Sequence, residues 1–239
     1  RADMNKYLDS GNEARIKKAY ESRDPRLQMA VITPYAQYNG ASSGIAHTYT
    51  LRWPYRGSDS AEPFDIRTDT NDKFYYLWRK FVPEGLEQTE RDTYGLDIPL
   101  IRYAEVLLLK AEALNEWGST HESEAIRCVN EVRRRAGHVE LNNATYPATK
   151  VNGQSDLRER IRNEYYWEIG GEDSMYFHEL RWGTWKDKKF DNNRNGLMQM
   201  WGETTYTWYW LGDQCWSWPI PAKEMEMNSN LEQNEGWIN

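Results

Sequence analysis

Apolar residues recur every three or four positions in three segments between residues 97 and 169, which is the spacing of amphipathic helices. The strongest pattern predicts a helix over 97–117, with Asp97 as its N-cap, Pro99 in its first turn and Gly118 as its stop. Its apolar stripe consists of Ile101, Ala104, Leu108 and Ala111, widened by Leu100, Tyr103, Leu107 and Leu114.

A second helix is expected after a short turn, because Ser119 and Glu122 have the spacing of a capping box and Gly137 follows the last apolar position. Arginines 133–135 fall in its last turn, where positive charge stabilises the helix dipole. The two helices are predicted to form an antiparallel hairpin of tetratricopeptide length, which needs neighbouring structure to cover it. Its apolar face consists of Ala125, Cys128, Val129, Val132 and Ala136.

Three shorter helices are expected on either side of this hairpin. The first runs over 12–23 and ends before Pro25, because the residue that precedes a proline avoids the helical region. Another runs over 156–169 and ends at the glycine pair that follows it. Residues 174–182 predict a short helix, and a polar loop is expected over 186–204.

Strand patterns are weaker. The segment RLQMAVIT at 26–33 alternates and predicts a short strand, whereas 33–72 is rich in Gly, Ser, Asp, Pro and Tyr and predicts an ordered surface loop. In YTWYWLGDQCWSWPIP at 206–221, apolar residues alternate on both sides of a Gly-Asp pair, which predicts a β-hairpin. Its rings then divide between two faces, and at most one face, with Tyr209 or Trp216, is left open to a ligand or partner.

The amino-acid composition and the net charge exclude some classes of function. The 239 residues suit one large domain or two small ones, and 12 Trp, 16 Tyr and 5 Phe compensate for an apolar fraction of only 39%. The net charge of −7 argues against a nucleic-acid-binding protein, which normally has a basic surface. The sequence lacks the run of about 18 apolar residues that a membrane-spanning helix needs.

Motifs for catalysis or metal binding are weak. The four histidines do not have the spacing of a metal site, and the nucleotide-binding and nucleophile-elbow motifs are missing from the sequence, so no cofactor or metal is expected. The acid pairs Glu105/Glu112 and Glu164/Glu168 each lie on one predicted helix, and two carboxylates on one helix seldom flank a glycosidic bond. Arg102 and Arg160 offer simpler explanations for these acids, as ion-pair or capping partners. The two cysteines, at 128 and 215, are expected to be buried and free.

Aromatic residues on irregular segments are the best candidates for ligand binding, because sugar rings stack on flat apolar faces while hydroxyls find polar side chains. The segment YTLRWPYRG at 49–57 combines three rings with two arginines around a rigid proline. The alternative is that these rings pin the loop to the body of the protein. The predicted ligand-binding residues are Tyr49, Trp53, Tyr55 and Arg56, with Tyr35 and Tyr38 as supporting candidates.

Seven ordered segments resemble the SusD/RagB family of outer-membrane nutrient-binding lipoproteins, and match about the C-terminal half of a typical member. They are DPRL (24–27), RKF (79–81), IRYAEVLLLKAEALNE (101–116), EAIRCVNEVRRRAG (124–137), ELRWGTW (179–185), WPIP (218–221) and NSNLEQNEGW (228–237). The chain departs from the family where EYYWEIGGED places Tyr165 and Tyr166 at positions usually held by arginine, and where Glu235 replaces a frequent proline.

The resemblance implies a mostly α fold of tetratricopeptide-like helical hairpins with long irregular loops and a small β-hairpin. It implies that 1–239 is a single SusD-like C-terminal region packed on an absent N-terminal tetratricopeptide-like portion. Such proteins lie on the extracellular face of the outer membrane of Gram-negative bacteria, held by a lipid anchor that here would lie outside this chain.

The resemblance also implies a function without catalysis. Members capture an oligosaccharide or polysaccharide and deliver it to a SusC-type TonB-dependent transporter. Two alternatives from other classes stay open: a peptide- or protein-binding helical-repeat module, and a glycoside hydrolase.

Overall fold

The computed structural model divides into two compact units, residues 1–175 and residues 176–239. The structure describes residues 13–21, 23–42, 45–55, 65–69, 77–85, 95, 97–172, 174–189 and 210–237. The side chains of 13–16, 41–42, 52–55, 65–69 and 189 are left out of this description.

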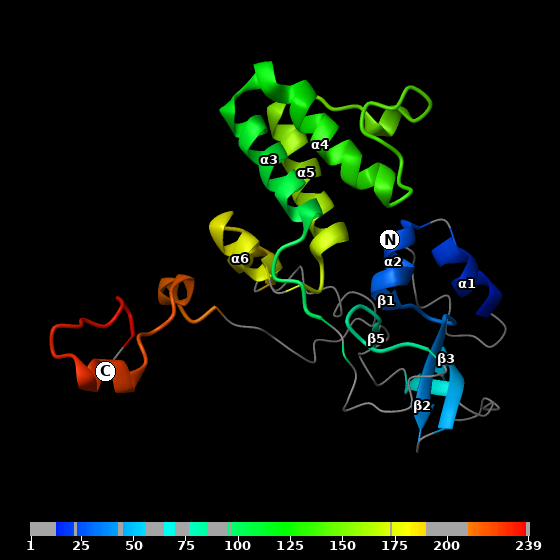
Figure 1. Cartoon of the computed structure of the whole chain (residues 1–239), viewed down its shortest axis with the longest axis horizontal. Helices are drawn as coiled ribbons and strands as arrows, with labels where there is room; N and C mark the ends of the chain where they lie inside the picture. The colour runs from blue at the N-terminus through cyan, green and yellow to red at the C-terminus, as the bar shows by residue number, and fades with distance from the viewer. Residues whose placement is uncertain are drawn as a thin grey trace. The chain divides into compact units, whose positions relative to one another are not determined.

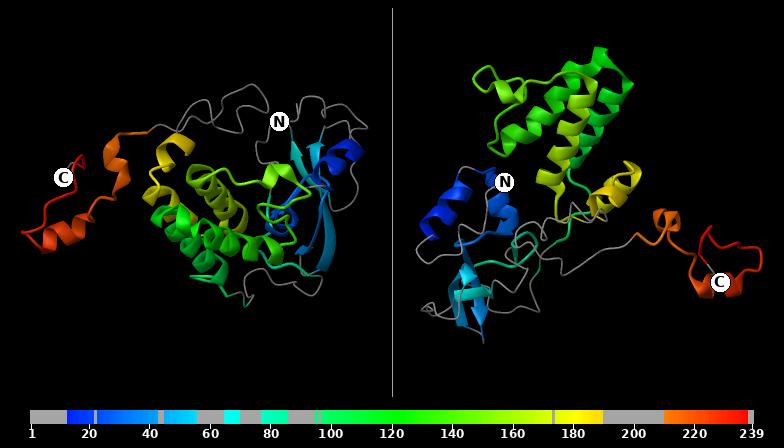
Figure 2. Two further views of the ribbon diagram at one scale, coloured as in Figure 1. Left: turned by 90° about the horizontal axis from the view of Figure 1, so that it is seen from above. Right: turned by 180° about the vertical axis from the view of Figure 1, so that it is seen from behind.

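Three helices lie side by side in the first unit (Figures 1 and 2). They are α3 (Tyr103–Trp117), α4 (Glu122–Arg135) and α5 (Gln154–Ile169). A short connection, Gly118 and the 3-10 turn η2 (Ser119–His121), joins α3 to α4 and makes the two helices antiparallel. The predicted helical hairpin and the mostly α fold class are therefore confirmed, and α5 packs against α3 as part of the cover that one hairpin needs.

The core of this helical body is built from apolar side chains that are almost entirely removed from water. Each large one contributes roughly 1.5–3 kcal/mol to the free energy of folding. The side chains are Leu107, Leu108, Ala111 and Leu114 from α3, Ala125, Ile126, Cys128, Val129 and Val132 from α4, and Leu157, Ile161, Tyr165 and Ile169 from α5. Cys128 is buried as predicted, whereas Cys215 is only half-buried, and both are free thiols.

The structure corrects the start of the first predicted helix. Helix α3 begins at Tyr103, so Asp97 is not its N-cap and Pro99 is not in its first turn. Arg102 occupies the N-cap with extended dihedral angles (φ −111°, ψ 153°), and its guanidinium binds the carboxylates of Glu168 and Glu172. The chain before α3 therefore stays outside the helix, and Leu100, Ile101 and Tyr103 of the predicted stripe are exposed.

The starts of the next two helices also differ from prediction. Helix α4 begins after η2 with His121 at its N-cap and no capping hydrogen bond from a side chain, so the predicted capping box does not form. Its end is as predicted, with Gly137 at φ 70°. Helix α5 begins at Gln154, two residues before the prediction. Within its first turn, the Asp156 carboxylate accepts a hydrogen bond from the Asn152 amide at 2.8 Å.

A three-stranded sheet replaces most of the loop predicted for 33–72. Strand β2 (Gln37–Ser42) pairs antiparallel with β3 (Ile45–Tyr55), and β4 (Asp65–Asp69) pairs parallel with the other edge of β3. The alternation of threonine and tyrosine along 48–50 was the available sequence signal, since both residue types favour strands. Because many other residues of the segment are polar, the sequence pattern predicted a surface loop instead of strands.

The segment RLQMAVIT is mostly helix, which corrects the predicted strand. Helix α2 (Pro25–Ala30) has proline at its first position, and the Asp24 carboxylate caps it by accepting a hydrogen bond from the Arg26 amide at 2.9 Å. Only β1 (Val31–Ile32) is a strand, paired antiparallel with β5 (Leu77–Trp78). Helix α1 (Glu13–Glu21) precedes α2, close to the prediction.

The second unit contains short elements: α7 (Trp185–Lys189), η4 (Asp213–Trp216) and α9 (Ala222–Met227). Helix α6 (Ser174–Arg181), predicted over 174–182, contains the division between the units. In the part of the chain that the structure describes, no helix is long and apolar enough to cross a bilayer.

The predicted β-hairpin is wrong for the residues that the structure describes after position 209. The chain forms the 3-10 turn η4 instead, with the Cys215 amide donating to the Gly212 carbonyl at 3.0 Å. The rings of Trp210 and Trp216 lie 4.9 Å apart, and the Trp237 indole donates to main-chain carbonyls of the same turn. These contacts favour the local turn over a strand pair. Tyr209 lies outside the described residues.

Candidate functional site

A surface pocket of about 670 Å³ lies where α1, α2, β2 and β3 meet in the first unit. We call it the tyrosine pocket. Its lining combines two aromatic rings with amide, hydroxyl and charged groups, the mixture that small polar ligands require. The lining residues that matter below are Tyr20, Gln28, Tyr35, Gln37, Thr50 and Arg79.

The pairing of β2 with β3 decides which predicted residues face this pocket. Gln37 and Thr50 are directly paired, and both line the pocket. Successive residues of a strand point to opposite faces, so the next pair, Tyr38 and Tyr49, faces the other side of the sheet. There the two rings lie 6.4 Å apart, and the Tyr38 hydroxyl donates to the Pro83 carbonyl at 2.7 Å.

Tyr35 stands at the pocket in an unusual backbone conformation. Its φ of 64° lies in the left-handed region, which costs a residue other than glycine roughly 1–3 kcal/mol. Two main-chain hydrogen bonds with the fully buried Leu51 hold the turn: the Tyr35 amide donates at 2.7 Å, and the Ala36 carbonyl accepts at 3.0 Å. The surrounding structure thus fixes the position from which the Tyr35 side chain reaches the pocket.

Arg79 joins two walls of the tyrosine pocket. Its guanidinium donates to the Gln28 carbonyl of α2 at 3.0 Å and to the Gln37 carbonyl of β2. Glu84 forms an ion pair with the same side chain at 3.1 Å. A cation that binds the backbone on both sides holds the two walls of the pocket together.

The predicted ligand-binding residues are therefore separated. Tyr35 lines the tyrosine pocket, whereas Tyr38 and Tyr49 lie on the opposite face of the sheet. Trp53 and Tyr55 belong to β3, but their side chains are outside the described set, as is the whole of Arg56.

Sequence reasoning missed the other residues of the pocket. Tyr20 lies on the amphipathic pattern of the first helix, and Arg79 begins the RKF segment, which carries part of the family resemblance. Either signal could have drawn attention to these residues. Neither could have shown that they meet Gln37 and Thr50 across a sheet that was itself missed.

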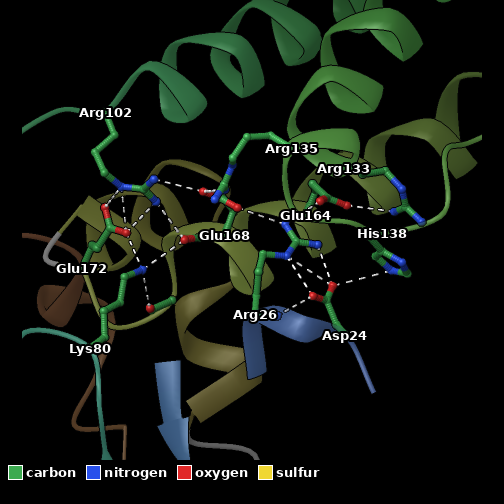
Figure 3. Close-up of polar contacts among 11 residues, drawn as sticks. Asp24, Arg26, Lys80, Arg102, Arg133, Arg135, His138, Glu164, Glu168 and Glu172 are labelled. Carbon is green, nitrogen blue, oxygen red and sulfur yellow. Dashed lines mark hydrogen bonds and ion pairs between the residues drawn. The ribbon is translucent and has the colours of Figure 1, made fainter. Parts of the chain in front are cut away.

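An ionic network joins the helical body to α2 and to the segment after β5 (Figure 3). Its centre is Glu164, whose side chain is 0% exposed. One Glu164 oxygen accepts from Arg26 at 2.7 Å and the other accepts from Arg133 at 2.8 Å. Both arginines are buried, so three charged side chains from α2, α4 and α5 compensate one another away from water.

Glu168, one turn further along α5, is the second centre. Its carboxylate accepts from Arg26 at 3.1 Å, from Arg102 at 3.0 Å and from Arg135 (Figure 3). Glu172 then binds Arg102 through two oxygens and pairs with Lys80. Lys80 also donates to the Glu168 and Gly170 carbonyls at the end of α5. The network thus fixes α2, the start of α3 and the end of α4 against α5.

These contacts shift the pKa values of three side chains in the network. Burial raises the pKa of Glu172, but hydrogen bonds from Arg102 and Lys80 outweigh it and hold the pKa below its ordinary value. Asp24 shows the same balance, since burial raises its pKa and the hydrogen bonds from Arg26 lower it further than burial raises it. Burial and the nearby Arg133 lower the pKa of His138, which keeps its imidazole neutral at about pH 7.

The carboxylates of the network are engaged by cations rather than placed across a cleft. Glu164 and Glu168 both lie on α5, and each binds two or more arginines. Glu164 and Glu168 thus have the ion-pair role expected from the sequence. Arg102 is one of the partners, whereas Arg160 pairs with Asp156 instead. Among the described residues, no three His, Cys, Asp or Glu side chains gather as metal ligands would.

The sequence model of the SusD family matches residues 4–237. The chain belongs to the SusD family. It is 32% identical over 139 residues to SusD-like protein P38 of Formosa agariphila. The aligned segment covers 58% of this chain and 24% of that protein. It is 28% identical over 161 residues to the starch-binding protein SusD of Bacteroides thetaiotaomicron, which covers 67% of this chain and 25% of that protein.

Solved structures show the same SusD-like fold. A SusD-like protein of Bacteroides fragilis superposes with a TM-score of 0.62 at 22% identity, over 94% of this chain and 41% of that one. A SusD homologue of Bacteroides thetaiotaomicron superposes with a TM-score of 0.58 at 23% identity, over 90% and 41%. This SusD-family chain therefore spans about a quarter of those curated relatives and about two fifths of those solved structures.

The first prediction concerns the buried centre of the network. Glu164→Gln removes the carboxylate that buried Arg133 pairs with and one of the carboxylates around Arg26, so we expect the free energy of unfolding to fall by about 3–5 kcal/mol. Urea unfolding followed by circular dichroism measures the loss. Glu159→Gln is the matched control on the same helix, because its side chain is 62% exposed and its loss should stay below about 0.5 kcal/mol. Equal effects of the two substitutions would contradict a compensating role for Glu164.

The second prediction concerns pH. The folded state lowers the pKa of Glu172, so its stabilising contribution is complete above the ordinary carboxyl pKa and is lost as the pH falls through the lower, folded value. The stability difference between the unmodified chain and Glu172→Gln should therefore shrink as the pH is lowered from about 5 to about 3. Urea unfolding at each pH measures it. A difference that is constant over this range would show that the Glu172 ion pairs do not stabilise the fold.

Proposed function

We propose that this chain is the ligand-binding part of a cell-surface protein that captures oligosaccharides for nutrient uptake. The observation that carries the proposal is the tyrosine pocket, in which two tyrosines stand among amide and hydroxyl groups in a SusD-family chain. The relative from Bacteroides thetaiotaomicron is named a starch-binding protein, which supports a glycan as the ligand class.

The chemistry of the tyrosine pocket suits a sugar. Pyranose rings present apolar C–H faces, for which the rings of Tyr20 and Tyr35 offer flat partners. Hydroxyl groups both donate and accept hydrogen bonds, and the side chains of Gln28, Gln37 and Thr50 do the same. Binding of this kind needs no general acid or nucleophile, so the proposed activity is capture without turnover.

A second contact surface is proposed on β3 and the chain that follows it. It comprises Tyr38 and Tyr49, whose rings lie together on the face opposite the tyrosine pocket, and the sequence-predicted residues Trp53, Tyr55 and Arg56. Substitution of Trp53 by alanine tests this surface separately from the tyrosine pocket.

The proposal also includes delivery of the glycan to a transporter and the location of the protein at the cell surface. The captured glycan passes to a SusC-type TonB-dependent transporter, and a lipid anchor outside this chain holds the protein at the extracellular face of a Gram-negative outer membrane. Family membership supports these steps.

One observation favours the alternative of a peptide- or protein-binding module. Apolar side chains at the start and along one side of α3 are exposed, among them Leu100, Tyr103 and Trp117. Competition separates the two functions: an excess of unlabelled peptides should leave glycan binding unchanged if the tyrosine pocket is the main site. Displacement of the glycan by peptides but not by sugars would favour the alternative.

The third prediction tests the tyrosine pocket. Tyr20→Ala and Tyr35→Ala each remove one stacking face, so each should weaken glycan binding by about 3- to 10-fold. Affinity electrophoresis against a broad polysaccharide panel identifies the ligand, and calorimetry with that ligand measures the loss. Tyr103→Ala is the control, because this exposed tyrosine lies on α3 and does not line the pocket.

Two outcomes would contradict different parts of the proposal. If no polysaccharide of the panel retards the unmodified chain, the glycan function is wrong. If a glycan binds and the pocket variants match Tyr103→Ala, the function stands and the tyrosine pocket is the wrong site.

A further inference from the structure

A second pocket, of about 280 Å³, opens beside the ionic network. We call it the arginine pocket. Four cationic side chains and a single acid line it: Arg26, Lys80, Arg102, Arg135 and Glu168. Apolar surface comes from Trp167, Phe81 and Pro99. Its size suits one sugar ring rather than a chain, since pockets for drug-sized ligands start at about 300 Å³.

In the part of the chain that the structure describes, the ion pairs around the arginine pocket join more cations than carboxylates. Five cations, Arg26, Lys80, Arg102, Arg133 and Arg135, face four carboxylates, Asp24, Glu164, Glu168 and Glu172 (Figure 3). The neutral imidazole of His138 leaves this balance unchanged. The excess stands out in a chain whose net charge is −7. An anion that enters the pocket would balance it.

Arg135 is the cation best able to bind such an anion. Its side chain is 60% exposed, and one of its nitrogens donates to Glu168. A guanidinium has five N–H donors in a planar fork, so the group has further donors to offer. Glu168 also accepts from Arg26 and Arg102, so it stays compensated if Arg135 turns toward a ligand.

We propose that the arginine pocket binds the carboxylate of an acidic sugar, a hexuronate unit of a glycan, with Arg135 as its main charged partner. A planar carboxylate matches the guanidinium fork through two parallel hydrogen bonds. The ring that carries this carboxylate would lie against Trp167, which is 46% exposed and lines the same pocket. The ligand class rests on the proposed glycan-binding function, but the site is separate from the tyrosine pocket.

The fourth prediction uses two probes with the same sugar backbone: trigalacturonate, which carries carboxylates, and its fully methyl-esterified form, which is neutral. Calorimetry at low ionic strength should show that the unmodified chain binds the acid at least about tenfold more tightly than the ester, because a charge-assisted hydrogen bond contributes that much. Added salt should reduce the preference.

The matched variants are Arg135→Gln and Arg134→Gln. Both arginines lie in the last turn of α4 and have similar exposure, 60% and 65%, but Arg134 pairs with Glu140 and does not line the pocket. Arg135→Gln should abolish the preference for the acid, and Arg134→Gln should keep it. Urea unfolding confirms that both variants are folded, which is expected because Glu168 retains Arg26 and Arg102.

Several results would overturn this proposal. They are equal affinity for acid and ester, failure of the unmodified chain to bind either probe, and equal loss in the two arginine variants. Tighter binding of a sulfated trisaccharide or of a short peptide carboxylate would overturn the hexuronate as the ligand.

Failure here can be told apart from failure of the proposed function. If neutral glycans bind through Tyr20 and Tyr35 but the acid is not preferred, the tyrosine pocket stands and the arginine pocket does not. If the acid is preferred through Arg135 and no neutral glycan binds, the arginine pocket stands and the tyrosine pocket does not.

Discussion

The fold of the first unit depends on a carboxylate that is fully removed from water, that of Glu164, held between two arginines. Arg26 comes from α2 and Arg133 from the end of α4, so one side chain of α5 connects three elements that are distant in sequence. Burial of three charges is costly, and the attraction between them repays the cost only when all partners are in place. The arrangement therefore specifies one position of α2, and α2 in turn contributes Gln28 to the tyrosine pocket.

Much of the helical fold could be predicted from the sequence, because apolar periodicity is a local property. The buried face of α4 and the end of that helix at Gly137 were correct. The start of α3 was wrong because Arg102 is drawn to acids 66 and 70 residues away, and no local pattern reports such a contact. The sheet was missed because its strands carry polar residues on one face. The turn at 213–216 was missed because alternating apolar residues suggest paired strands, whereas local ring contacts stabilise a turn.

The candidate sites also depend on contacts between distant residues, which local sequence patterns do not report. Tyr35 was found because aromatic residues on irregular segments draw attention, but its partners Tyr20 and Arg79 come from other elements. The arginines of the last turn of α4 were given a role in the helix dipole, and they do lie in that turn. Their side chains do more: Arg133 compensates a buried acid and Arg135 reaches a pocket. One run of three like charges thus serves the fold at one position and, by our proposal, a ligand at another.

The buried ion pair of Arg26 and Glu164 joins α2 to α5. A double-mutant cycle with Arg26→Gln, Glu164→Gln and the double variant, measured by urea unfolding, determines how much this pair stabilises the fold. We expect the double variant to lose less stability than the sum of the single variants, by about 1–3 kcal/mol. Additive losses, within about 0.5 kcal/mol, would contradict it, because the two side chains would then act independently.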